Sequence, residues 1–337
     1  MILRLFLMGS LLMTAAQAFA WPYPTLSGDR PIVIAHRGAS GYLPEHTLEA
    51  YSLAIELGAD FIEPDLVLTK DGQLVARHDY YLSGSTDIAD HPEFADRKKT
   101  IDGREDWFVE DFTLAEIKTL RAKQAFPGRS IAFDGQFSIP TFDEILSLVA
   151  EHEAQGGQQV GVYPETKHPD HYASLGLDFV PPLLKALERH GYQDRDAPLF
   201  IQSFEPGILK RLRDATDFRL IMLVFPKNEI DPAADALSPS VSLEEAAQFA
   251  DGVGPSKALV LDSSGKDTGF VKKAHDLGLA VHIWTMRDDR LSAPFQTSQD
   301  EYAQIFRIGV DGVFTDFTPS GVLYRGLIAA GAKDKAP

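Results

Sequence analysis

The sequence predicts an α/β protein: a TIM (β/α)8 barrel with a small subdomain inserted after the second strand region. Three observations lead to this expectation. Eight short apolar runs recur along the chain, helical patterns separate them, and several reactive side chains stand where the runs end. Strands that are apolar on both faces need cover on both sides, and the helices of a closed parallel barrel provide part of that cover.

The eight expected strands are recognised by their β-branched and aromatic residues. In chain order they are PIVIAH (31–36), FIEPDLVL (61–68), QVGVYPE (159–165), PLFIQSF (198–204), RLIMLVF (219–225), ALVLD (258–262), LAVHIWT (279–285) and GVFTD (312–316). Intervening segments such as 46–58 and 180–191 have apolar residues at helical spacing and end in Gly. An open doubly wound sheet is the main alternative, but no Gly-rich phosphate turn follows the first run.

Residues 79–136 interrupt this alternation. They are polar, acidic and rich in turn residues, and only a stretch near 113–123 has a helical pattern. Long loops of this fold lie over the catalytic face, so we expect this insertion to serve substrate recognition. Residues 21–337 are otherwise expected to form a single domain that contains the insertion.

The first twenty residues have the pattern of a signal peptide. Arg4 precedes an apolar run that ends in Ala18-Phe19-Ala20, a small-x-small cleavage pattern. A membrane anchor is the competing interpretation, but the run is short for a bilayer span of about 20 residues, so we expect no stable membrane insertion. The sequence contains no cysteine. We therefore expect an exported protein, periplasmic or secreted, that does not depend on disulfides.

The composition is strongly acidic, with a formal net charge of −17. Such a surface should repel nucleic acid and anionic membranes, so nucleic acid is not an expected partner. A phosphate-bearing small molecule would have to meet cations gathered inside one cleft. The sequence does not predict an oligomeric state.

Three carboxylates are expected to form a metal site. Glu63 and Asp65 are two positions apart on one strand, so their side chains point to the same side, and Glu165 ends the next strand. A cluster of hard oxygen ligands suits Mg²⁺ or Ca²⁺. A structural salt bridge is the ordinary role of an isolated buried carboxylate, but three such groups together favour a metal.

Two histidines stand beside this acidic group in the sequence. His36 ends the first strand, and His78 follows a short return strand at 73–77. One imidazole could take a proton from a nucleophile while the other gives a proton to a leaving group. We therefore expect His36 and His78 to be the catalytic acid and base.

Four further side chains at strand ends are expected to bind substrate. Arg37 offers a planar fork of donors to a phosphate, and Lys167 offers a point charge. Gln202 closes the fourth strand. Trp284 ends the seventh and would line the pocket, although a packing role explains an aromatic residue equally well.

At these residues the chain resembles the glycerophosphodiester phosphodiesterase family, most closely its periplasmic branch. The resemblance rests on the motifs AHRGASGYLPEHTLEAY, DFIEPDLVLTKDGQLVARHD, YPETKHP, IQSFEP, VHIWTM and GVDGVFTDF. The first two are the specific ones, because His-Arg-Gly followed by Glu-x-Asp and then His-Asp is long and composite. One departure is Tyr163, which stands where the family often has a lysine two residues before the third-strand glutamate.

The resemblance implies a TIM barrel that hydrolyses glycerophosphodiesters, such as glycerophosphocholine or glycerophosphoethanolamine, to sn-glycerol 3-phosphate and an alcohol. It implies that one divalent ion, Ca²⁺ before Mg²⁺, is held by Glu63, Asp65 and Glu165. The histidine pair would act as acid and base, and Arg37 and Lys167 would hold the phosphate.

Other classes of function remain open at this point. They are a phospholipase-type phosphodiesterase of a related barrel, a glycoside hydrolase with Glu63 and Glu165 as its acidic pair, and a non-catalytic protein that binds a phosphorylated ligand. The last two leave the histidine pair without a role.

Overall fold

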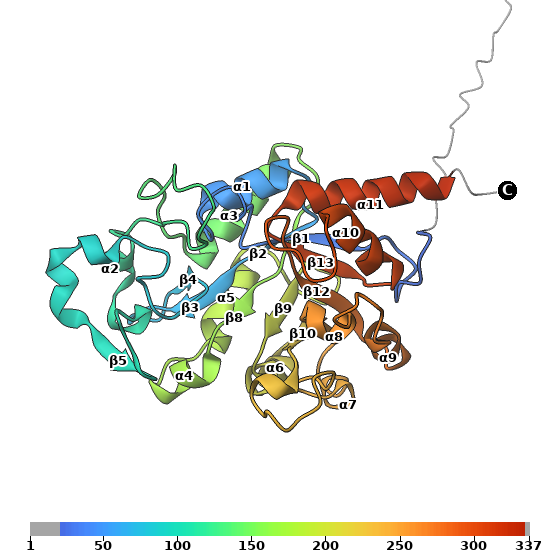
Figure 1. Cartoon of the computed structure of the whole chain (residues 1–337). Coiled ribbons are helices and arrows are strands. Elements are labelled where there is room, and N and C mark those ends of the chain that lie inside the picture. Colours follow the sequence, from blue (N-terminus) through green and yellow to red (C-terminus); the bar gives the residue numbers. More distant parts are fainter. Residues whose placement is uncertain (1–20, 334–337) are drawn as a thin grey trace, which may run out of the picture.

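Residues 21–333 are described by a computed structural model, in which helices surround a central curled sheet (Figure 1). The expected signal peptide, residues 1–20, lies outside these residues. Within the described part of the chain, no helix is long and apolar enough to cross a membrane.

The central sheet has eleven strands, nearly all of them parallel. Two of its eight barrel positions are split in two, the second into β2 and β3 and the third into β7 and β8, while β4 returns antiparallel to β3. The strands are β1 (Ile32–His36), β2 (Phe61–Glu63), β3 (Asp65–Leu68), β4 (Leu74–Ala76), β7 (Gly161–Val162), β8 (Glu165–Thr166), β9 (Phe200–Ser203), β10 (Arg219–Val224), β11 (Gly252–Pro255), β12 (Ala280–Met286) and β13 (Gly312–Thr315).

Strand pairing closes this sheet into a ring. β1 pairs in parallel with both β2 and β13, the first and last barrel positions beside it. Across the split third position, β2 pairs with β7 and β3 pairs with β8. The third position joins the fourth through the pair Glu165–Gln202 and the bridge Val162–Leu199. The predicted TIM barrel is therefore confirmed.

Prolines cause both splits. Pro64 separates β2 from β3, and Pro164 separates β7 from β8, because proline has no N–H to donate to the next strand. The proline carbonyls still accept at 2.9 Å, from the backbone N–H of Glu165 and of Gln202 respectively. The barrel thus stays connected at the level where the acidic residues project inward.

The prediction of a strand at 258–262 was wrong. The sixth strand is β11, and residues Lys257–Val260 form the short helix α8. β11 contains two glycines that close packing requires. A Cβ at Gly254 would lie 2.5 Å from a Leu223 methyl carbon, and one at Gly252 would lie 2.7 Å from the Ala280 carbonyl oxygen.

Helices cover the outside of the barrel, and several begin at a side-chain cap. Thr47 accepts the N–H of Ala50 at the start of α1, and Thr141 and Glu144 form a capping box at the start of α3. The helices are α1 (Leu48–Glu56), α3 (Phe142–Ala154), α4 (Pro169–Ser174), α5 (Val180–Arg189), α6 (Pro206–Ala215), α7 (Leu243–Ala246), α8, α9 (Phe270–Asp276), α10 (Ser298–Arg307) and α11 (Thr318–Lys333), with a 3₁₀ turn η4 at Lys227–Glu229.

Between β4 and α3, where the barrel needs only a connection, the chain forms a layer of short elements beside the barrel (Figure 1, cyan to green). They are η1 (Ile88–Asp90), η2 (Pro92–Arg97), β5 (Lys99–Ile101), β6 (Arg104–Asp106), η3 (Val109–Asp111) and α2 (Leu114–Ile117). The helix expected near 113–123 is therefore only one turn long, because the chain leaves helical geometry for an isolated bridge at Arg121.

An apolar cluster fills the barrel interior. Tyr163 is fully buried there, with its ring centroid 5.0 Å from those of Phe200 and Phe314. Its hydroxyl pairs with Nδ1 of His282 at 2.8 Å. Phe61 packs against the same cluster. These rings form the floor on which the acidic residues stand.

Candidate active site

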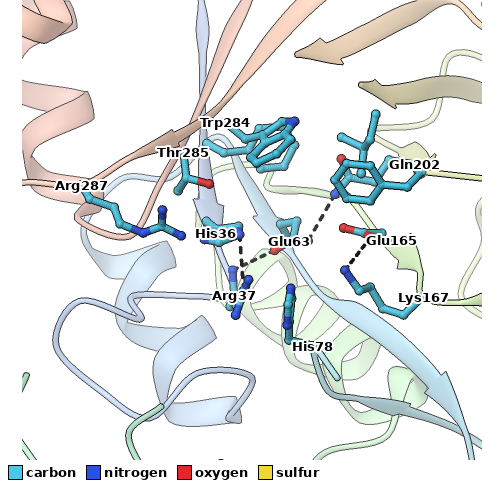
Figure 2. A pocket seen from close by; sticks show the side chains of 13 residues that line it. His36, Arg37, Glu63, His78, Glu165, Lys167, Gln202, Trp284, Thr285 and Arg287 are labelled. Carbon is cyan, nitrogen blue, oxygen red and sulfur yellow. Dashed lines mark hydrogen bonds and ion pairs between the residues drawn. The ribbon is translucent and has the colours of Figure 1, made fainter. Parts of the chain in front are cut away.

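A pocket opens at the carboxyl ends of the barrel strands, the face that carries catalysis in this fold. It contains about 440 Å³ of empty space, including its open mouth. Eight of the nine predicted site residues line it, and Figure 2 shows most of them around Glu63. The eight are His36, Arg37, Glu63, His78, Glu165, Lys167, Gln202 and Trp284. The ninth, Asp65, belongs to the acidic cluster at the base of the pocket.

Glu63, Asp65 and Glu165 come together as expected from their positions on neighbouring strands. One carboxylate oxygen of each lies within 4.8 Å of the others, and all three side chains are buried. They are the one such group of metal-binding side chains among residues 21–333. Glu63 and Asp65 flank Pro64, so they point to the same side of the split strand.

Burial and mutual repulsion perturb this cluster. Burial, followed by the charges of Asp65 and Glu165, raises the pKa of Glu63 well above its usual range. Burial also raises the pKa of Glu165 to about 8, against the opposing effect of Lys167. Burial acts against ionisation of Asp65, yet Lys167 and His46 hold the pKa of that carboxyl well below its usual range. Carboxylates this close fit a divalent cation that would neutralise them.

A second layer of contacts orients the acidic cluster. His46 lies between Asp65 and Tyr51, with its Nε2 2.9 Å from the Asp65 carboxylate and its Nδ1 2.7 Å from the Tyr51 hydroxyl. Glu63 accepts the backbone N–H of Arg37 at 2.8 Å and the side-chain amide of Gln202 at 3.2 Å. Such outer contacts fix ligand orientation in metal sites.

His36 is held by a carboxylate from the far end of the chain. Its Nδ1 lies 2.6 Å from Oδ1 of Asp316, which is fully buried. Burial acts against ionisation of Asp316, but His36 and two nearby arginines hold its pKa far below its usual range. Because an ionised carboxylate only accepts, Nδ1 is the donor, and Nε2 is the acceptor nitrogen, which receives a hydrogen bond from Arg37 Nε at 3.3 Å. Burial, then the charge of Arg37, lowers the pKa of His36 to about 4.

His78 is arranged similarly with its neighbour in the sequence. Its Nδ1 lies 2.9 Å from Oδ1 of Asp79. Burial, then the charges of Arg37 and Lys167, lowers the pKa of His78 to about 4. His78 therefore donates through Nδ1, as His36 does, and its Nε2 is the nitrogen that can accept a proton.

The two predicted phosphate-binding cations are charged and already paired. Arg37 donates to Glu45 at 2.8 Å, and Nζ of Lys167 lies 2.8 Å from Glu165. Arg37 also adopts a left-handed backbone conformation, with φ 59°, which is uncommon for a non-glycine residue, and its side chain lies beside His36 and Glu63 (Figure 2). Gly38 follows with φ 80°, and a Cβ there would lie 2.7 Å from the backbone of Ala50.

Trp284 and Gln202 complete the pocket wall. The Trp284 indole N–H donates to the carbonyl of Gly254 at 2.7 Å, and its ring packs edge-on against Phe204. The indole face is thus available to the pocket while its polar atom is satisfied. Tyr163 belongs to the floor below, so the position where the family often has lysine contributes no polar group to the pocket lining.

Sequence reasoning missed several residues of the site. Asp79 was discoverable, because it directly follows His78, and Asp316 stands where the last strand ends. Arg287 follows β12 and both lines the pocket and donates to Asp316 at 2.7 Å. Arg129 lies in the insertion and donates to Asp316 at 2.6 Å, and nothing in the sequence indicated this contact.

Comparisons with known proteins agree with this geometry. Residues 36–319 match the model of the glycerophosphoryl diester phosphodiesterase family. A glycerophosphodiester phosphodiesterase of Arabidopsis thaliana is 36% identical over 90% of this chain and 88% of its own length. The Haemophilus influenzae glycerophosphodiester phosphodiesterase is 35% identical over 86% of this chain and 88% of its own length.

Solved structures share the fold at lower identity. A structure described as a glycerophosphoryl diester phosphodiesterase from Silicibacter pomeroyi has a TM-score of 0.66 and 23% identity, covering 89% of this chain and 94% of that one. A phosphodiesterase from Oleispira antarctica, solved with the product sn-glycerol 3-phosphate, has a TM-score of 0.63 and 23% identity, covering 89% and 99%.

Proposed function

The chain belongs to the glycerophosphoryl diester phosphodiesterase family, and from this premise we propose that it hydrolyses glycerophosphodiesters such as glycerophosphocholine and glycerophosphoethanolamine to sn-glycerol 3-phosphate and the free alcohol. It is an enzyme, a glycerophosphodiester phosphodiesterase, as its relatives are named. The observation that carries the proposal is one pocket that holds three clustered carboxylates and two imidazoles, each oriented through its Nδ1.

Glu63, Asp65 and Glu165 would hold one divalent cation, Ca²⁺ in preference to Mg²⁺. Support for a divalent cation comes from the closeness of their oxygens, from the raised pKa of two of them and from their purely oxygen chemistry, and the preference for Ca²⁺ rests on the family resemblance. When bound, such an ion supplies positive charge that offsets the phosphate and lowers the pKa of an oxygen near it.

The two imidazoles would move the protons. One Nε2 takes the proton of the attacking hydroxyl or water as the new P–O bond forms. The other imidazole, in its protonated form, gives a proton to the alcohol oxygen as the old P–O bond breaks. Asp316 and Asp79 stabilise the charge on whichever ring is protonated.

Arg37 and Lys167 would bind the phosphoryl oxygens. Their carboxylate partners hold them in place, and their buried surroundings strengthen their attraction for an anion. Gln202 and Trp284 would contact the glycerol or alcohol part. The product-bound structure of the Oleispira antarctica phosphodiesterase supports a glycerol 3-phosphate subsite in a barrel of this shape.

Turnover of glycerophosphocholine tests this proposal. Purified protein should release glycerol 3-phosphate, lose the activity on addition of EDTA and regain it with Ca²⁺. An unchanged rate in EDTA together with trapping of a covalent glutamyl adduct would favour the glycosidase. Binding without turnover in excess metal would favour a silent binding protein.

We further propose that the protein is exported, on the strength of the cleavage pattern that ends at Ala20. Expression of the full chain in a bacterium should yield periplasmic protein whose measured mass matches a chain that starts at Trp21. Retention of the uncleaved chain in the cytoplasm would contradict this.

A further inference from the structure

Asp316 is the meeting point of three basic side chains. Its Oδ1 accepts the Nδ1 proton of His36, while its Oδ2 accepts from Arg129 Nη2 at 2.6 Å and Arg287 Nε at 2.7 Å. Asp316 itself is fully buried. Both of its oxygens are therefore engaged, and the carboxylate cannot rotate without breaking a charged hydrogen bond.

Arg129 comes from the insertion rather than from the barrel. Its side chain is only 3% exposed, and it also forms a two-pronged contact with Asp289 at 2.8 and 3.2 Å. Nη1 donates to the backbone carbonyl of Ser40 at 3.2 Å. Its guanidinium packs over the rings of Phe126 and Phe317, at 4.2 and 5.3 Å from their centroids. The guanidinium is thus fixed from several sides.

The same stretch of the insertion lies on the loop that follows β1. The side-chain amide of Gln124 approaches the carbonyls of Ser40 and Leu43 at 3.4 and 3.5 Å, and the Ser40 hydroxyl donates to the carbonyl of His36 at 2.8 Å. Residues 124–129 therefore contact the backbone of Ser40 and Leu43, in the loop that follows His36, as well as the carboxylate partner of His36. Substrate recognition alone does not require contacts of this kind.

We propose that Arg129 is a positioning residue for His36, acting through Asp316. By occupying Oδ2 beside Arg287, Arg129 keeps Oδ1 directed at the imidazole. This supports the ring orientation and the tautomer in which Nε2, which accepts from Arg37 Nε at 3.3 Å, is the unprotonated nitrogen. The effect on turnover rests on the proposed function, in which His36 transfers a proton. The insertion would then help to assemble the proton-transfer site.

Arg129→Ala, compared in calcium-loaded mature protein, is the main test. We expect kcat to fall about tenfold or more while KM stays within about twofold, because the defect lies in proton transfer rather than in binding. Arg129→Lys, which keeps one charged donor, should recover part of the loss. Added guanidinium should restore activity to Arg129→Ala by filling the space left by the side chain.

Arg97→Ala is the matched control. Arg97 also lies in the insertion, pairs with a carboxylate (Glu116, 2.7 Å) and packs over two aromatic rings, but it does not contact Asp316. Its substitution should leave kcat unchanged. If Arg129→Ala does not fold, Arg129→Gln, which keeps most of the side-chain volume, takes its place.

Exchange of the imidazole proton gives a readout that needs no turnover. In protein labelled with ¹⁵N-histidine, the Nδ1 proton of His36 should exchange with water about tenfold faster in Arg129→Ala than in wild type or Arg97→Ala. An inactive wild-type enzyme would refute the proposed function while this measurement still tests the contact. Unchanged proton exchange, or a loss expressed only in KM, would show that Arg129 does not position His36.

Discussion

His36 and His78 make similar hydrogen bonds, but different parts of the structure fix their orientation. Each directs Nδ1 at a carboxylate, but the partner of His36 is Asp316, 280 residues away, whereas the partner of His78 is the next residue. The His36 side chain is 12% exposed and its carboxylate is fully buried; the corresponding values for His78 and Asp79 are 34% and 27%. The orientation of His36 thus depends on closure of the whole barrel, and that of His78 depends on local structure.

Removal of each imidazole should have the largest effect on activity. We expect His36→Ala and His78→Ala each to lower kcat by about 10² or more, because each removes a proton-transfer group. Added imidazole should restore more activity to His78→Ala than to His36→Ala, because the His78 side chain is the more exposed of the two, at 34% against 12%. Steady-state kinetics with and without imidazole measure this. Equal restoration of both variants would remove the distinction between the two sites.

Substitution of Asp316 or Asp79, the carboxylates that orient the histidines, should lower kcat by less than loss of an imidazole does. Asp316→Asn should lower kcat by about 10- to 100-fold, whereas Asp79→Asn should lower it by no more than about threefold, since water can replace a partner that is partly exposed. The comparison requires kcat at saturating substrate and calcium. A larger loss in Asp79→Asn would mean that His78 is the more tightly positioned ring.

A change in the acidic cluster should lower turnover through calcium binding, without distinguishing the two histidines. Glu63→Gln should weaken calcium binding about tenfold or more by removing one anionic ligand, and excess Ca²⁺ should partly restore turnover. Isothermal titration calorimetry measures the affinity without reference to activity. Unaltered calcium affinity would exclude Glu63 as a ligand.

The smallest expected effect is on thermal stability. Calcium at about 100 times its Kd should stabilise the fold by about 2.7 kcal/mol and raise Tm by about 5 °C, because it relieves repulsion among buried carboxylates. His36→Ala and His78→Ala should show the same rise, since neither ring is a proposed ligand, while Glu63→Gln should show less. Calorimetric melts with calcium or EDTA test this, and a rise that disappears in a histidine variant would place that imidazole in the ion site.

The contrast between the histidines also explains how far the sequence could lead. Alternating strands and helices predicted the barrel, and the spacing of Glu63 and Asp65 predicted the acidic cluster, because both depend on short-range periodicity. The sixth strand was missed because Gly252 and Gly254 are required by close packing with neighbouring strands, and a local pattern contains no information about those neighbours.

The partners of His36 could not be predicted for the same reason. Asp79 adjoins its histidine, but Asp316 reaches His36 only when β13 lies beside β1, and Arg129 reaches Asp316 only when the insertion folds back over the barrel. The sequence shows a carboxylate at the end of a strand, but it does not show which histidine that carboxylate would orient. Long-range hydrogen bonds of this kind have no periodicity to detect.

The aromatic floor under the acidic cluster has a consequence for the timing of turnover. Tyr163, Phe200 and Phe314 fill the lumen, so ions and substrate share the mouth above as their route to Glu63 and Glu165. A cation would then have to arrive before the diester and depart after glycerol 3-phosphate. Release of calcium should slow when product is bound. The order in which ion and substrate bind would then follow from the closed lower end of the barrel.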